Sequence, residues 1–223
     1  MKLVNANLLI ELDIEENMPA LLVVENPSIL TEIVEGLYAS SHGEEGDFIL
    51  TEGNRELSID KTVEIIVNPF AIDFNSRQIQ NKLYNVMLAA GNQYEETKAQ
   101  IQTMVLRFLE MIIRDLPYEM IGCNDMLDLQ RLFKMYDVRL EPDCLTVLER
   151  LTEYTKVMTR LLRKELIVLV NICCYLSECD LRAFAEMCAY QKLKVLFIES
   201  QERRFLFSVG TYIIDHDKCI IIK

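Results

Sequence analysis

The chain has 223 residues, a net charge of −12 and an apolar fraction of 51%, with only 7 glycines and 5 prolines. This composition excludes disordered, collagen-like and linker-rich chains, and the length suits one large domain or two small ones. Because no run of about 18 uncharged apolar residues occurs, we expect no membrane span. We expect no secretion signal, because the N-terminal stretch MKLVNANLLIELDIEEN carries acids where a signal peptide has its apolar segment.

The acidity is unevenly distributed along the chain. Residues 77–164 hold 13 Lys and Arg against 12 Asp and Glu, whereas the remaining residues hold 10 against 23. An evenly spread negative charge would repel nucleic acid, but exposed charges more than about 8 Å apart are screened at physiological salt. A basic face in the middle segment can therefore act independently of the acidic ends.

The cysteine pattern indicates a reducing, cytoplasmic environment. The seven cysteines are an odd number, and no two of them form a CxxC pair. Since His42 and His216 are the only histidines, the chain also lacks the ligands for a zinc site of ordinary spacing. We expect the cysteines to be reduced thiols.

The first third of the chain is predicted to contain short strands around one helix. The strands are expected at residues 2–12, 21–24 and 63–70. Pro27 or Ser28 can begin the helix, because apolar residues recur at helical spacing after them. The glycine-punctuated, acidic stretch from Ser40 suits a hairpin or an irregular loop.

The middle of the chain is predicted to be helical. Helices are expected at residues 77–90, 94–116, 125–137 and 142–164. The second has the clearest pattern, because eight apolar residues from Ile101 to Leu116 form one wide stripe before Pro117 ends the helix.

The last third returns to an α/β pattern. Apolar strands are expected at residues 165–177 and 194–200, a helix at 177–192 and a closing hairpin at 211–223. Continuous apolar strands separated by a helix indicate a parallel sheet that is covered on both faces. The predicted fold class is therefore α/β, with a head formed by residues 1–76 and 165–223 and an inserted helical leg formed by residues 77–164.

The strand, turn and helix around residue 25 occupy the place where a P-loop NTPase carries its phosphate loop. That loop needs glycines whose amides surround the phosphates and a lysine that reaches them. Here Glu25 and Asn26 stand instead, and Asn171 occupies the position where a magnesium-binding Asp is expected. We expect no enzyme, and an active P-loop NTPase is the least favoured alternative.

Basic residues of the leg are the candidates for nucleic-acid binding. The main run consists of Lys156, Arg160, Arg163 and Lys164. At helical spacing these cations form one face that can bind phosphates, but the pattern alone favours a solvated face at a helix C-terminus. The same two alternatives apply to Arg107, Arg114, Arg131 and Lys134. No base-reading motif accompanies any of them.

Acids in the connector at residues 115–128 are a weaker candidate for metal binding. Glu119, Asp125 and Asp128 can supply part of the roughly six to eight oxygens that calcium requires. Because no EF-hand pattern is present, a solvated connector is the default interpretation.

Four residue strings resemble a known family. They are LLVVENPSILTEIVEGLY, IIVNPFAIDFNS, RKELIVLVNICCYLSECDLRAFAEMCAYQKLKVLFIES and YIIDHDKCIII. In this order and spacing the chain resembles the CRISPR-associated adaptation protein of type II-A systems, the short form in the Csn family. Together with the matching length, the strings cover nearly the whole chain.

The resemblance implies a degenerate P-loop NTPase-like head without ATPase activity and an inserted α-helical leg. It implies a homotetrameric ring whose basic channel binds double-stranded DNA, preferentially at linear ends and without sequence preference, during spacer acquisition. It also implies calcium bound by leg acids, of which Glu119 and Asp125 remain here, while Ile121 and Cys123 replace others. Expected partners are the CRISPR integrase complex and the RNA-guided effector nuclease. The alternative is a purely structural scaffold that binds proteins and not DNA.

Overall fold

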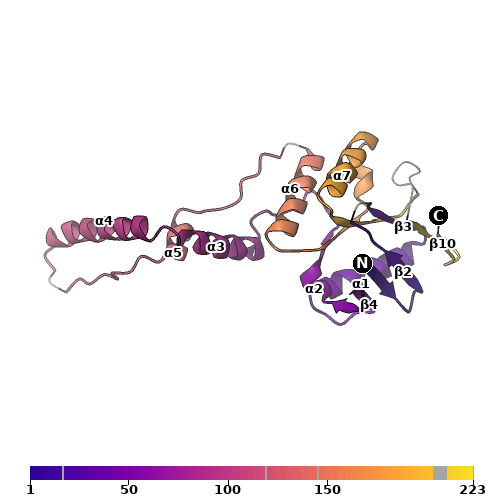
Figure 1. Ribbon diagram of the computed structural model, residues 1–223, viewed down its shortest axis with the longest axis horizontal. Helices are drawn as coiled ribbons and strands as arrows, with labels where there is room; N and C mark the ends of the chain where they lie inside the picture. Colours follow the sequence, from indigo (N-terminus) through magenta and orange to yellow (C-terminus); the bar gives the residue numbers. More distant parts are fainter. Residues whose placement is uncertain (17, 119, 145, 203–209, 223) are drawn as a thin grey trace. The chain divides into compact units, whose positions relative to one another are not determined.

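A computed structural model of the chain describes residues 1–16, 18–118, 120–144, 146–202 and 210–222. The chain divides into two compact units, drawn in Figure 1. The first, which we call the head unit, comprises Met1–Phe74 and Pro142–Lys223. The second, which we call the insert unit, comprises Asn75–Glu141.

The head unit is built on a six-stranded sheet with the order β10-β9-β3-β8-β7-β6. Five of these strands run parallel, and β10 pairs antiparallel with β9. The bounds are β3 Ala20–Val24, β6 Val63–Ile66, β7 Leu166–Val170, β8 Lys194–Glu199, β9 Thr211–Ile214 and β10 Ile220–Ile222. Because β3 pairs with both β8 and β9, the two ends of the chain form one sheet, as predicted.

A smaller antiparallel sheet of the head unit has the order β2-β1-β4-β5. Its strands are β1 Lys2–Asn5, β2 Ile10–Asp13, β4 Phe48–Glu52 and β5 Arg55–Leu57. The prediction of one strand over residues 2–12 is wrong, because Asn5 Oδ1 accepts a hydrogen bond from Leu8 N–H at 3.0 Å and the chain turns there into a hairpin. The hairpin expected after Ser40 is confirmed by β4 and β5.

Both faces of the six-stranded sheet are covered. On one face α1 (Pro27–Ser41) contributes Ile33 and Leu37 to a core that it shares with both sheets. On the other face, Phe184 of α7 (Glu178–Tyr190) meets Phe197 of β8 edge to face, with 6.2 Å between the ring centroids. Every residue of β3 and β7 is consequently buried, as expected for parallel strands between two layers. Short helices α2 (Ile59–Thr62) and η1 (Ile172–Tyr175) complete the unit.

Helix α6 (Val147–Arg160) belongs to the head unit, which corrects the predicted domain boundary at residue 164. Its Leu151 and Met158 are fully buried, and the helix packs beside α7. Because these side chains are buried within the head unit, α6 is not part of the leg that was predicted over residues 77–164. The inserted unit is therefore shorter than predicted at its C-terminal end.

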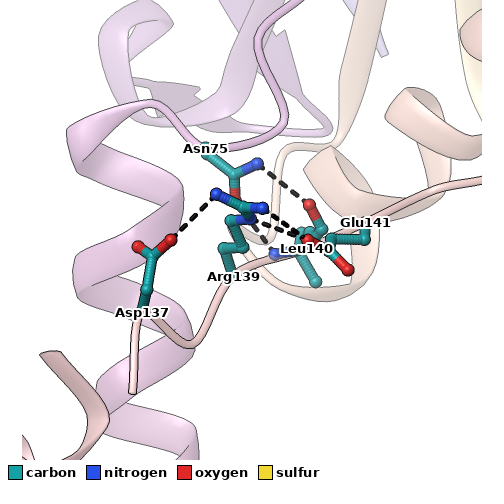
Figure 2. A network of polar contacts seen from close by, with 5 residues as sticks. All are labelled: Asn75, Asp137, Arg139, Leu140 and Glu141. Carbon is teal, nitrogen blue, oxygen red and sulfur yellow. Dashed lines mark hydrogen bonds and ion pairs between the residues drawn. The ribbon is translucent and has the colours of Figure 1, made fainter. Parts of the chain in front are cut away.

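The described residues of the insert unit form three helices, α3 (Arg77–Gly91), α4 (Glu95–Arg114) and α5 (Leu129–Met135). Helices α3 and α5 pack together, with 6.0 Å between the ring centroids of Tyr84 and Phe133. The Asn75 side chain donates to the Leu140 carbonyl and accepts from the Leu140 N–H, both at 2.9 Å (Figure 2). These two bonds tie the first and last segments of the insert unit together.

Helix α4 leaves its apolar stripe uncovered. None of its residues is buried, and Met104, Phe108 and Met111 are 65%, 61% and 57% exposed. None of the helices in the described part of the chain is long and apolar enough to cross a membrane.

We expect Phe184→Ala to lower the free energy of unfolding by about 3–5 kcal/mol, because it removes a fully buried ring and leaves a cavity beside Phe197. Tyr190→Ala in the same helix is the control, since Tyr190 is 90% exposed and its loss should change stability by within about 0.5 kcal/mol. Urea unfolding followed by circular dichroism measures both. Equal losses would contradict the packing of α7 described above.

Candidate nucleic-acid interface

The eight cations predicted to bind DNA are divided between the two units. The head unit holds Lys156, Arg160, Arg163 and Lys164, and the insert unit holds Arg107, Arg114, Arg131 and Lys134. Each set is therefore positioned by the packing of its own unit.

Helix α6 carries two cations of the head-unit set. Lys156 is partly buried, and its Nζ pairs with Glu153 at 2.6 Å. Arg160 is exposed at the last residue of the helix, where its guanidinium donates a long hydrogen bond of 3.4 Å to Gln191 Oε1 at the end of α7. Because α6 ends here, the predicted basic helical face is limited to Lys156 and Arg160.

Arg163 and Lys164 follow α6 and have opposite environments. Arg163 is exposed, and its backbone lies in the left-handed region with a φ of +63°. Lys164 is only 6% exposed, and its Nζ donates to the carbonyls of Asp60 at 2.6 Å and Val63 at 2.7 Å. The prediction that Lys164 lies on an exposed phosphate-binding face is wrong, because its ammonium is bonded inside the head unit.

Lys164 belongs to a small, partly buried polar cluster with Asp60, Glu64 and Tyr154. Burial lowers the pKa of the Lys164 ammonium, while attraction to Glu64 and Asp60 acts in the opposite direction. Burial also raises the pKa of Glu64, against a hydrogen bond of 2.8 Å that the Tyr154 hydroxyl donates to its carboxylate. The pKa of Tyr154 is raised by burial first and by Glu64 second. The charges of this cluster are thus satisfied within the protein.

The cations of the insert unit lie on α4 and α5. Arg107 and Arg114 are exposed on α4, seven residues apart in sequence. Lys134 is exposed in the last turn of α5, whereas Arg131 pairs with Asp128 at 3.3 Å. All four side chains reach solvent, and one of them already has an acidic partner.

The basic residues of the chain differ in whether a carboxylate of the protein already pairs with them. Arg139 is already paired, because its guanidinium lies 2.8 Å from the Asp137 carboxylate and 2.7 Å from the Glu141 carboxylate (Figure 2). Across the residues that the structure describes, no ion pair involves five of the predicted cations, which are Arg107, Arg114, Lys134, Arg160 and Arg163. These five are the groups best suited to bind an external anion.

Lys192 is a basic residue that the sequence pattern missed. It follows Gln191 directly, is exposed and has a φ of +55°. The hydrogen bond between Arg160 and Gln191 brings the end of α7 to the end of α6, so Lys192 joins the basic end of α6. A basic residue after a helix is the only signal in the sequence, and it does not show which helix ends lie together.

The turn after β3, which lies where a P-loop NTPase carries its phosphate loop, ends in Asn26, the N-cap residue of α1. Asn26 Oδ1 accepts hydrogen bonds from the amides of Ser28 at 3.0 Å and Ile29 at 3.4 Å. These are the amides at the start of α1 that a phosphate would bind. After β7, Asn171 adopts a φ of +51° and its Oδ1 accepts from Ser200 N–H at 3.0 Å. The side-chain oxygens of both asparagines therefore accept hydrogen bonds from backbone amides of the protein.

The predicted calcium ligands do not assemble into a site in the described residues. Glu119 lies outside them, and Asp125 is exposed. No group of three or more His, Cys, Asp or Glu side chains that could hold a metal ion occurs in the described ranges. The residues described thus do not fit the roughly six to eight oxygens that calcium requires, and calcium binding stays a prediction.

Comparison with known proteins points to a single family. Residues 40–218 match the family model described as CRISPR-associated protein (Cas_Csn2). A protein of Enterococcus faecalis named CRISPR-associated protein Csn2 is 24% identical over 202 residues, which cover 89% of this chain and 91% of the relative. One of the same name from Streptococcus agalactiae is 24% identical over 203 residues, covering 90% and 89%.

A solved structure shares the fold. The crystal structure of Stu0660 of Streptococcus thermophilus matches with a TM-score of 0.63 at 15% sequence identity, covering 96% of this chain and 74% of that one. Because the family model spans well over half of the chain, the chain belongs to the Csn2 family of CRISPR-associated proteins, which confirms the resemblance drawn from its sequence.

Proposed function

We propose that this chain is a non-enzymatic protein that binds double-stranded DNA without sequence preference, preferentially at linear ends, during CRISPR spacer acquisition. The observation that carries the proposal is the exposed pair Arg160 and Arg163, neither of which has an ion-pair partner among the described residues. Guanidinium groups of this kind bind phosphate oxygens and release counterions, which gives affinity without reading the bases. Family membership supports a role in the CRISPR system.

A homotetrameric ring is the proposed working form. The head unit holds 15 Lys and Arg against 26 Asp and Glu, so one copy attracts DNA only weakly through a few local cations. Several copies in one assembly bind far more tightly, since each further contact is intramolecular. The exposed apolar stripe of α4 supports association, because stripes of this kind commonly mark protein interfaces.

The proposed setting is the cytoplasm, with the CRISPR integrase complex and the RNA-guided effector nuclease as partners. All seven cysteines lie in the described ranges and are free thiols, which suits a reducing compartment. The phosphate-loop position supports the non-enzymatic part of the proposal. Its Asn26 already bonds the amides that a nucleotide would need, and no lysine stands in this turn.

We expect Arg160→Glu combined with Arg163→Glu to abolish binding of a blunt linear duplex, because two attractive phosphate contacts per chain become repulsive. Fluorescence anisotropy over a salt series measures the affinity. The wild type should weaken steeply, with a slope of log K against log salt of about −0.9 per phosphate contacted. A closed-circular competitor should displace the linear duplex poorly.

The matched control is Arg55→Glu combined with Lys218→Glu, which makes the same change of charge at two other exposed cations of the head unit. The control should keep most of the affinity. Unchanged binding in the Arg160 and Arg163 variant would contradict the proposed interface, and equal losses in both variants would reduce it to an effect of net charge.

We expect Phe108→Glu to dissociate the assembly, because a carboxylate in the middle of the α4 stripe is costly to bury between copies. Light scattering should then report a mass approaching 25.9 kDa, whereas the wild type should be about four times heavier. Gln100→Glu is the control, since it adds the same charge to the other face of α4 and should leave the mass unchanged. A wild type that is monomeric at working concentration would argue against the ring.

We expect no saturable ATP binding in the presence of magnesium, because the amides at the start of α1 are occupied by Asn26. Isothermal calorimetry provides the measurement. Asn26→Ala should cost about 1 kcal/mol of stability through loss of the helix cap, without creating a nucleotide site. A micromolar, saturable isotherm for the wild type would show that the turn still binds phosphates.

A further inference from the structure

We propose that Lys164 is a positioning residue that holds Arg163 in place for a DNA phosphate and does not itself touch DNA. This inference rests on the proposed DNA binding. It assigns phosphate contact to Arg163 and support of the turn to Lys164. Three observations carry it, namely the end of α6, the left-handed backbone of Arg163 and the buried ammonium of Lys164.

The backbone is held immediately after Arg163. Lys164 N–H donates to the Met158 carbonyl in the last turns of α6 at 3.0 Å. Glu165 N–H then donates to the Thr62 carbonyl at 2.8 Å, just before β7 begins. Arg163 therefore lies in a short turn between a helix and a central strand, with fixed points on both sides.

The Lys164 side chain adds a second anchor to this turn. Its Nζ donates at 2.6 Å and 2.7 Å to carbonyls of Asp60 and Val63, where α2 ends and β6 begins. An ammonium has three donors, and two of them are used here. With 6% of the residue exposed, the group cannot bind a phosphate unless it leaves these carbonyls.

The conformation of Arg163 ends α6 and fixes where its side chain leaves the backbone. At a φ of +63° Arg163 takes the left-handed position that commonly ends a helix, although a residue with a Cβ atom is less stable there than glycine, and the bond from Lys164 N–H to the Met158 carbonyl holds it. Arg163 is exposed and has no ion pair in the described structure, so the strain is not offset by a contact of its guanidinium with the protein. The anchored turn instead holds this guanidinium in solvent three residues after Arg160.

A double-mutant cycle tests the division of tasks. The variants are Lys164→Met, Arg163→Gly and the two combined, each measured for affinity and salt slope on a blunt linear duplex well below its Tm. Arg163→Gly should raise the Tm, because glycine prefers this backbone, and should reduce the magnitude of the salt slope by about 0.9 for one lost phosphate. Lys164→Met should reduce the slope by a measurable part of that amount, and the combined variant should lose no more than Arg163→Gly alone.

Two other outcomes of the cycle would overturn the inference. Additive slope losses in the combined variant would mean that Lys164 contacts a phosphate directly. A lower Tm for Lys164→Met with unchanged affinity and slope would mean that Lys164 only stabilises the fold. If the wild type does not bind DNA at all, the proposed function itself is contradicted. The wild-type measurement distinguishes this outcome from a failure of the inference about Lys164.

If Lys164→Met does not fold, a footprint on the wild type tests the part of the inference that Lys164 does not touch DNA. Lysines are acylated with a soluble reagent, with and without the duplex, and the modified sites are identified by mass spectrometry. Lys164 should stay unreactive in both conditions, whereas the exposed Lys192 should react without DNA. A Lys164 that reacts alone and is protected by DNA would overturn the inference.

Discussion

Burial of the parallel strands on both faces is the constraint on which the head unit depends. No residue of β3 or β7 reaches solvent, so the sheet requires two covering layers. Helix α1 and the four-stranded sheet supply one layer, and α7, with α6 packed beside it, lies on the other face. Helix α6 is therefore committed to the head unit, and the cations at its end are fixed by the packing of that unit.

The same constraint gives two neighbouring cations different chemistry. One step along the chain, from exposed Arg163 to buried Lys164, leads from solvent into the interior, where the Lys164 ammonium bonds the carbonyls of Asp60 and Val63. A buried ammonium is tolerated when carbonyls and nearby carboxylates satisfy it, as those of Asp60, Val63 and Glu64 do here. Arg163 is exposed and has no ion-pair partner in the described chain, so a count of basic residues overstates the number of cations that are available to an external anion.

Much of the fold was predictable from local signals. Continuous apolar runs identified the central strands, but the capping box of Thr146 and Glu149 was overlooked, so the helix expected from residue 142 begins at Val147. Two features were not predictable, for the same reason. The burial of Lys164 depends on carbonyls about one hundred residues away, and an amphipathic helix such as α6 looks alike in a leg or on a sheet. Likewise, no sequence signal shows that Arg160 meets Gln191.

The two surfaces proposed to act, the apolar stripe of α4 and the basic end of α6, belong to different units and respond differently to salt. Excluded salts such as sulfate strengthen apolar association, whereas any added salt weakens phosphate contacts by reducing the gain from counterion release. Helix α4 buries none of its own residues, and Arg163 has no ion-pair partner in the described chain. Each surface can therefore bind a partner without any part of the chain unfolding. The proposed ring would therefore stay assembled at salt concentrations that release the proposed DNA ligand.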